Sequence, residues 1–131
     1  MNKIKIEYCC FLNQSGYSTA AQDLILALHQ SRKYDIKLHA FAGKPARPAV
    51  SDERYAIFSK MIKKESDPEA IQILHSIPTL QKKVKHRKSK NIAFATFETF
   101  NPPDNWISIL NQNDAMIAPS FLIIIFLLIL R

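Results

Sequence analysis

The clearest structural signal comes from residues 4–41, which read IKIEYCCFLNQSGYSTAAQDLILALHQSRKYDIKLHAF. Residues 4–11 alternate apolar and charged side chains and then become wholly apolar, as expected for a strand that runs into a core. After a polar break, apolar side chains recur at helical spacing between Ala21 and Leu28. Residues 36–41 alternate again. A strand, a helix and a second strand of these lengths predict a parallel βαβ unit.

The start of this first helix is predicted at Thr19. Thr19-Ala20-Ala21-Gln22 matches a capping box, in which the hydroxyl and the amide satisfy backbone N–H groups at the helix start. Asp23 would then lie in the first turn, where the helix dipole favours a carboxylate. Gly16, one of two glycines in the chain, is interpreted as a turn residue or as a place where another group approaches the backbone.

The middle of the chain gives a weaker pattern. Residues 55–64 carry apolar side chains at helical spacing. Ser66-Asp67-Pro68-Glu69 is typical of a helix start, and this further helix is expected to continue through Leu74 and to end at Pro78.

The alternation of strands and helices continues towards the end of the chain. Residues 92–97 form an almost wholly apolar run, which indicates an interior parallel strand. A helix is expected from Pro102, and residues 115–118 predict a last short strand. The sequence therefore predicts an α/β domain with a Rossmann-like, doubly wound parallel sheet.

Composition limits the chain to one ordinary globular domain. Its 131 residues are 47% hydrophobic and 22% charged, which excludes a disordered or fibrous protein and leaves no room for a second full domain. Six positive charges lie within residues 82–90 and account for most of the net charge of +7. This run is interpreted as a solvated loop or helix face, with a patch for phosphate, anionic lipid or nucleic acid as the alternative. No aromatic residue interleaves it, which argues against single-strand nucleic-acid binding.

The cysteines and histidines suggest no metal site. Cys9 and Cys10 are adjacent, so on a strand they point to opposite faces and are expected to be reduced apolar fillers. The lack of a disulfide framework favours a cytoplasmic protein, and Glu7 interrupts any secretory signal. Each histidine is expected at the surface or at a helix end; they are His29, His39, His75 and His86.

No complete catalytic motif of a common kind is present, whether a phosphate-binding glycine loop, a nucleophile elbow or a metal-binding helix. In doubly wound sheets ligands bind at the carboxyl ends of the strands. The candidate site is therefore the loop after the first strand together with Glu98, Thr99 and Ser120. Glu98 is a candidate base or hydroxyl acceptor, although a loop carboxylate that faces water has the same signature.

The C-terminal stretch differs from the rest of the sequence. Residues 121–131 read FLIIIFLLILR, which is shorter than the ~20 apolar residues of a spanning helix. A buried segment, a weak membrane anchor and an out-of-frame continuation are the three interpretations, of which we favour the last. We therefore divide the chain into a domain at residues 1–120 and an apolar tail at residues 121–131, which is expected to promote aggregation or membrane adhesion.

Two stretches together resemble the GT4-like glycosyltransferases. Residues 13–21, NQSGYSTAA, are similar to the first loop and helix of that family. Residues 94–99, FATFET, are followed by Pro102, Pro103 and Trp106 and then by NDAMIAPS at residues 113–120. This second stretch is similar to a family segment with a glutamate after a strand, a proline, a tryptophan and a terminal Pro-Ser.

The resemblance implies the N-terminal half of a GT-B fold and transfer of a sugar from a nucleotide-sugar to a glycan or lipid acceptor. Ser15, Gly16 and Tyr17 would approach the donor, and Glu98 and Thr99 would line the acceptor side. No cofactor and no metal is implied, because helix dipoles and basic groups neutralise the departing diphosphate. The family's nucleotide-sugar pocket lies in a C-terminal domain that this sequence lacks, so a truncated chain with little or no transferase activity is expected.

Two other functions remain open at this point. One is a non-catalytic binding module that contacts a membrane peripherally through the basic run and the tail. The other is a different doubly wound domain, such as a response regulator, against which the lack of clustered acidic residues at the strand ends argues. No specific nucleic-acid partner is expected.

Overall fold

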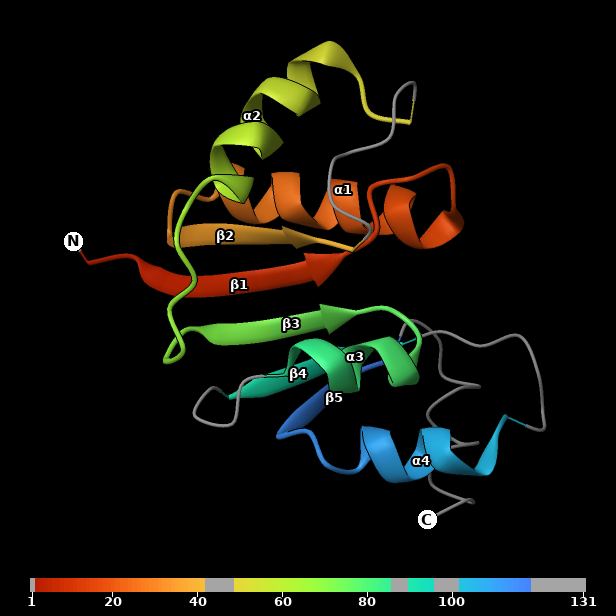
Figure 1. Ribbon diagram of the computed structural model, residues 1–131. Coiled ribbons are helices and arrows are strands. Elements are labelled where there is room, and N and C mark those ends of the chain that lie inside the picture. Colours follow the sequence, from red (N-terminus) through yellow and green to blue (C-terminus); the bar gives the residue numbers. More distant parts are fainter. Residues whose placement is uncertain (1, 42–48, 86–89, 96–101, 119–131) are drawn as a thin grey trace.

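The computed structural model describes residues 2–41, 49–85, 90–95 and 102–118, in which strands and helices alternate strictly (Figure 1). The strands are β1 (Ile4–Cys10), β2 (Tyr34–Ala40), β3 (Ile71–His75), β4 (Asn91–Phe94) and β5 (Ala115–Ile117). The helices are α1 (Gly16–Gln30), α2 (Asp52–Ile62), α3 (Pro78–Val84) and α4 (Asp104–Leu110). The βαβ unit predicted from residues 4–41 is confirmed.

The described strands form one sheet in the order β2-β1-β3-β4-β5, and every neighbouring pair is parallel. From β1 the chain moves to the edge strand β2 and then returns across β1 to build the other half of the sheet. This reversal is the mark of a doubly wound sheet, and it places a topological switch point between β1 and β3. The predicted α/β class and the Rossmann-like parallel sheet are confirmed.

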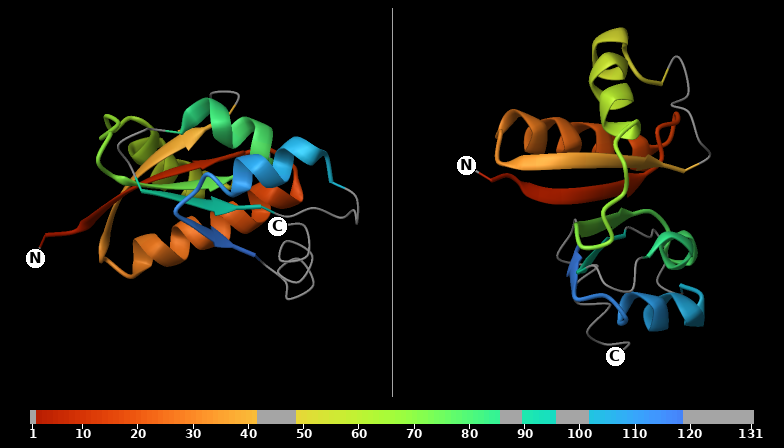
Figure 2. Two further views of the ribbon diagram at one scale, coloured as in Figure 1. Left: turned by 90° about the horizontal axis from the view of Figure 1, so that it is seen from below. Right: turned by 60° about the vertical axis from the view of Figure 1, so that its left-hand side comes forward.

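The helices cover both faces of the sheet. Helix α1 lies on one face, whereas α3 and α4 lie on the other (Figure 2). Ala21 and Ile25 of α1 are buried in the main core with Ile6 and Ile36, which are partners in the register between β1 and β2. The alternation of apolar and polar residues along β1 and β2 thus gives the sheet an apolar face. The apolar stripe of α1 packs against this face.

Helix α2 lies against β2, at one edge of the sheet (Figure 1). At its start, Arg54 donates to Asp23 of α1 at 3.0 Å. At its end, the Lys37 ammonium of β2 donates to the backbone oxygen of Ile62, and Lys64 pairs with Asp35. The helix therefore shields this edge, which would otherwise be open to pairing with another strand.

The predicted helix from Ser66 through Leu74 is wrong. The backbone oxygen of Asp67 accepts from the Ala70 amide and its carboxylate accepts from the Glu69 amide, each at 3.0 Å, so this stretch is a turn. Residues 71–75 then form β3, which pairs with both β1 and β4. Pro78 begins α3 and does not end a helix.

The cysteines and the basic run have the expected environments where the structure describes them. Cys9 and Cys10 are free and buried, and burial raises the pKa of the Cys10 thiol to about 12. Both are therefore apolar fillers in the thiol form at neutral pH. In the basic run, Lys82 and Lys83 lie exposed in the last turn of α3, whereas residues 86–89 lie outside the described part.

Candidate functional site

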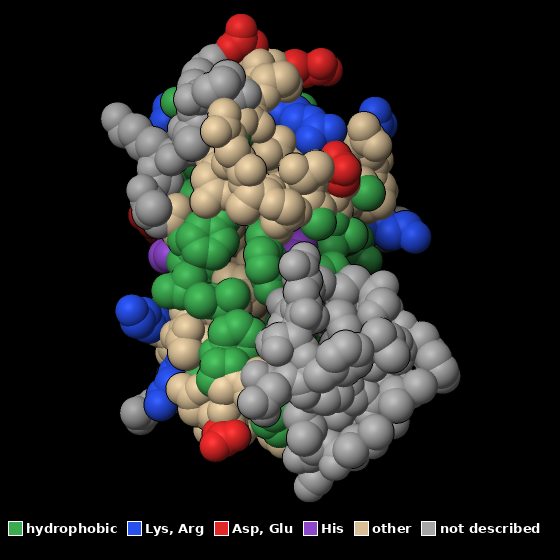
Figure 3. Space-filling view, turned by 90° about the vertical axis from the view of Figure 1, so that its right-hand side faces the viewer, with side chains coloured by type: hydrophobic (Ala, Val, Ile, Leu, Met, Phe, Trp, Pro, Cys, Tyr) green, Lys and Arg blue, Asp and Glu red, His purple; other side chains and the backbone are tan. Residues whose placement is uncertain are grey.

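The switch point lies at the carboxyl ends of β1 and β3. Cys10, the last residue of β1, is the register partner of His75, the last residue of β3. The chain then leaves β1 through residues 11–15 and enters α1. Figure 3 views the molecule from the side of these carboxyl ends. Hydrophobic side chains gather across the middle of this view, and charged side chains lie around its margin. Ligands of doubly wound proteins bind at this position.

Helix α1 begins at the switch point because Ser15 caps it. The Ser15 hydroxyl accepts from the Ser18 amide at 3.2 Å, and the Asn13 side chain accepts from the Ser15 amide at 3.0 Å. The predicted capping box at Thr19 is therefore wrong: the helix already starts at Gly16, and Thr19 lies within it. The earlier start places the first-turn amides and the positive end of the helix dipole at the switch point.

Gly16 is the first residue of α1 rather than a turn residue. It is exposed, and a Cβ atom built on it would meet no other atom within 4 Å. Space alone therefore does not require glycine here. What the missing side chain leaves open is the approach of another molecule to the first-turn amides.

We expect Gly16→Ala to raise the free energy of unfolding by about 0.4–1 kcal/mol, because alanine restricts the unfolded chain and fits the helical backbone. Urea denaturation measures the change. Ser15→Ala is the matched comparison, and it should lower the same quantity by about 1 kcal/mol through loss of the cap. A destabilised Gly16→Ala protein would show that the glycine has a conformational role.

A buried polar and aromatic cluster lies beside the first turn of α1. The Tyr8 hydroxyl and Nδ1 of His75 are hydrogen bonded at 2.7 Å, and His75 is only 1% exposed. The ring of Phe94 lies 3.9 Å from the imidazole between centroids, and Tyr17 meets it edge-on at 5.8 Å. Tyr17, the second residue of α1, thus links the helix start to the end of β3.

The expectation that His75 lies at the surface or at a helix end is wrong. Its position at the end of β3 turns it to the side of the sheet that carries Tyr8, whose hydroxyl satisfies one ring nitrogen. A sequence signal existed in retrospect. A short apolar run, Ile73-Leu74, ends in a polar residue, as interior strands do where they reach a site.

Burial sets the protonation state of this cluster. It lowers the pKa of His75 to about 4 and raises the pKa of Tyr8 well above its usual value near 10. Both groups are therefore neutral at pH 7, and His75 is a weak proton acceptor there. The cluster can position Tyr17 at the helix start. The positive end of α1 can attract an anion or a polar hydroxyl compound.

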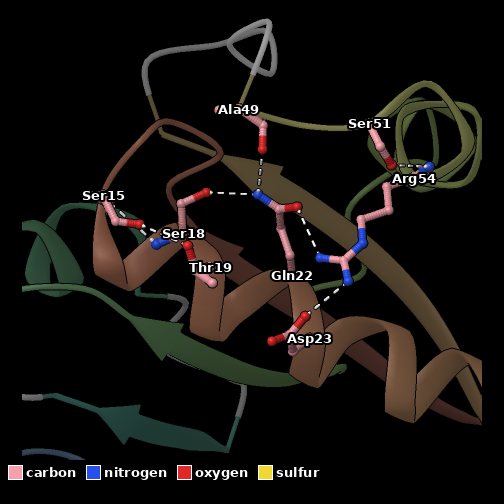
Figure 4. A network of polar contacts seen from close by, with 8 residues as sticks. All are labelled: Ser15, Ser18, Thr19, Gln22, Asp23, Ala49, Ser51 and Arg54. Atoms are coloured by element: carbon pink, nitrogen blue, oxygen red, sulfur yellow. Dashed lines mark hydrogen bonds and ion pairs between the residues drawn. The ribbon is translucent and has the colours of Figure 1, made fainter.

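A second set of hydrogen bonds holds the first turns of α1 in place (Figure 4). The buried Gln22 amide donates to the Ser18 hydroxyl at 3.1 Å and to the Ala49 carbonyl at 3.2 Å. Arg54 donates to the Gln22 oxygen at 3.2 Å and to Asp23 at 3.0 Å. The network ties the helix start to the segment that leads into α2. It also explains why Gln22 and Asp23 do not serve the helix start as the sequence suggested.

The structure places three of the predicted site residues together. Ser15, Gly16 and Tyr17 lie in succession at the switch point. Glu98 and Thr99 lie outside the described residues, as do Ser120 and the tail. Within the described ranges, no group of three or more His, Cys, Asp or Glu side chains could hold a metal ion.

A pocket among the described residues lies at the other end of the strands, where they begin. Its lining holds three lysines and three acidic residues, with Lys5 paired to Asp67 and Lys64 paired to Asp35. Two of its three lysines are therefore paired with acidic side chains, and the topology favours the switch point as the site.

No family model, curated protein or solved structure matches this chain.

Proposed function

We propose that this chain is the N-terminal domain of a GT-B glycosyltransferase and that its switch point receives the donor's phosphate or the transferred sugar. One observation carries the proposal. Ser15-Gly16-Tyr17, the stretch that resembles the family's first loop, begins α1 at the switch point of a doubly wound sheet.

The arrangement suits a phosphate-bearing sugar donor. Amide groups at a helix start stabilise negative charge without a metal, and Gly16 leaves the approach to them open. The neutral His75 adds no positive charge, so the attraction for phosphate would come from the helix end. In this proposal Glu98 and Thr99, which follow β4 in the sequence, serve the acceptor as base and hydroxyl-binding residue.

Sugar transfer needs two substrates held together away from water. In this proposal the described sheet would supply one wall of such a cleft. We therefore expect the 131-residue chain on its own to bind a donor weakly and to transfer sugar slowly or not at all. A non-catalytic binding module on the same fold predicts the same result, and a transfer assay with an added C-terminal domain separates the two.

The proposal is tested by following the amide resonances during titration with a uridine or guanosine diphosphate-sugar. We expect the resonances of Gly16, Tyr17 and Cys10 to shift. Gly16→Trp should weaken binding at least about tenfold by covering the amides, whereas Gly16→Ala should retain most of it. Shifts that avoid the switch point, or equal binding by both variants, would remove the assignment.

A further inference from the structure

The parallel topology gives this molecule two chemically different ends. All described strands start at the edge opposite the candidate site, at the left of Figure 1. Helices α1, α2 and α3 end at that edge, since each crosses back from the carboxyl end of one strand to the start of the next. Residues far apart in the sequence therefore share this end of the molecule, here called the amino edge.

Exposed basic side chains gather at the amino edge. They occupy the starts of β1 and β4, the ends of the three helices and the connections that follow, and they are Lys3, Lys5, Arg32, Lys33, Lys60, Lys63, Lys64, Lys82, Lys83 and Lys90. We call this set the amino-edge basic surface. The acidic residues of the same edge are fewer: Asp35, Glu65, Asp67, Glu69 and Asp114.

Only two of these basic side chains are neutralised by a direct ion pair. Lys5 pairs with Asp67 at 2.8 Å, and Lys64 pairs with Asp35. The other eight have no acidic partner within 4 Å in the part of the chain that the structure describes. The surface therefore carries uncompensated positive charge well beyond the run at residues 82–90.

Among the described residues, exposed acidic side chains lie at the opposite end. Helices α2 and α4 begin there with exposed Asp52, Glu53 and Asp104. Helix dipoles favour this distribution of charges at helix ends. They do not account for Lys3 and Lys90, which precede strands. The charge of the described residues is thus polarised along the strand direction.

We propose that the amino-edge basic surface docks this protein on an anionic lipid bilayer. Clusters of four to eight basic residues are sufficient for such adsorption. After the five acidic residues of the same edge are subtracted, the ten basic residues leave a net charge of 10 − 5 = +5, which lies within that range. All but one of the ten are lysines, which act as compact point charges. A bilayer surface presents diffuse negative charge and needs no directional contact. Base-specific recognition of a duplex relies on side chains that reach base edges, for which the planar fork of arginine is better suited than an ammonium group.

Docking through this edge sets the orientation of the domain. The candidate site at the carboxyl ends of the strands faces away from the lipid, so the bilayer does not obstruct it. The contact is peripheral in the described part of the chain, where no helix is long and apolar enough to cross a bilayer. The inference is independent of the proposed sugar transfer, because it uses none of the switch-point residues.

The test is sedimentation of the full chain with vesicles of phosphatidylcholine containing about 30% phosphatidylserine, in about 0.1 M KCl. We expect binding at least about tenfold tighter than to phosphatidylcholine alone, and its loss at about 1 M KCl. Equal binding to both vesicles would overturn the proposal, since it would show adhesion without charge. Tighter binding to duplex DNA or to polyuridine RNA at the same salt would overturn it in favour of a nucleic acid.

Two triple variants test whether vesicle binding involves the whole amino-edge basic surface or only the basic run at residues 82–90. Lys82→Gln, Lys83→Gln and Lys90→Gln remove charge from the run, whereas Lys33→Gln, Lys60→Gln and Lys63→Gln remove the same charge from elsewhere on the surface. We expect each set to weaken vesicle binding by roughly tenfold or more. Full binding by the second set would overturn the proposed surface. All six side chains are exposed, and circular dichroism verifies that the variants are folded.

A control variant raises the net charge at the other end. Glu53→Gln with Asp104→Asn removes two acidic charges from the carboxyl side of the sheet. We expect vesicle binding to stay within about twofold of the parent protein, because these positions face away from the bilayer. An increase comparable to the losses above would show that binding follows net charge, and would overturn a located surface.

Discussion

Acidification from pH 7.5 to pH 4.5 is expected to lower the free energy of unfolding by about 2–3 kcal/mol through His75 alone. Burial lowers the pKa of this imidazole from 6.5 to about 4 in the folded protein. Below pH 6.5 the unfolded chain therefore binds a proton that the folded chain does not accept until the pH nears 4. Stability falls across that window, by about 1.4 kcal/mol for each unit of pKa difference.

The pH window separates His75 from the carboxylates. Asp35 and Asp67 have pKa values held below 3.8, chiefly by hydrogen bonds from Lys64 and Lys5. Their contribution to the free energy of unfolding is present above the unfolded pKa of 3.8, and it is lost only as the pH falls below that value. Urea denaturation at pH 7.5 and 4.5 therefore reports mainly on the buried imidazole.

His75→Gln isolates the effect, because its amide can still reach the Tyr8 hydroxyl but does not titrate. We expect the difference in unfolding free energy between the two pH values to shrink below about 1 kcal/mol in this variant. His29→Gln, at an exposed position in the last turn of α1, should keep the parent difference. If His75→Gln kept it too, another group would carry the acid sensitivity.

Much of the fold follows from periodicity that the sequence displays. Residues 4–41 alternate with period two, then repeat with helical spacing, then alternate again, and the structure has β1, α1 and β2 there. These patterns are readable because each element buries one side and exposes the other. The two remaining strands that the sequence predicted, β4 and β5, also lie where apolar runs place them.

Strand β3 was missed because its polar residues are buried by partners from distant parts of the chain. Gln72 is fully buried, and its amide donates to the Val84 carbonyl at 3.0 Å. His75 bonds to Tyr8, which is 67 positions away in the sequence. The sequence does not reveal these partners, so Gln72 and His75 interrupt the apolar pattern expected of a buried strand. In addition, Ser66-Asp67-Pro68-Glu69 has the residues of a helix start, although no helix begins there.

The location of the candidate site was easier to predict than its chemistry. The rule that ligands bind at the carboxyl ends of parallel strands predicted the loop after the first strand as part of the site. The resemblance to the glycosyltransferases then singled out Ser15, Gly16 and Tyr17 within it. Which hydroxyl caps α1 was not predictable, since both Ser15 and Thr19 fit a cap. In the structure, Gln22 is engaged by Ser18, Ala49 and Arg54, so it cannot complete the later capping box.

Leu74→Ala is expected to lower the free energy of unfolding by about 2–5 kcal/mol, because it empties a fully buried position of the central strand. Ile71→Ala is the matched comparison. Ile71 is half-buried at the start of β3, so its truncation should cost no more than about half as much.

The comparison also tests β3 itself. In the helix that the sequence suggested, Ile71 and Leu74 would be three positions apart on one face and would share a similar environment. In the strand they point to opposite faces, and Leu74 pairs with Cys9 and Ala93 between two neighbouring strands. Urea denaturation of the two variants distinguishes these arrangements. Equal costs would argue for the helix, whereas a large difference requires the central strand and, with it, the switch point that it forms with β1.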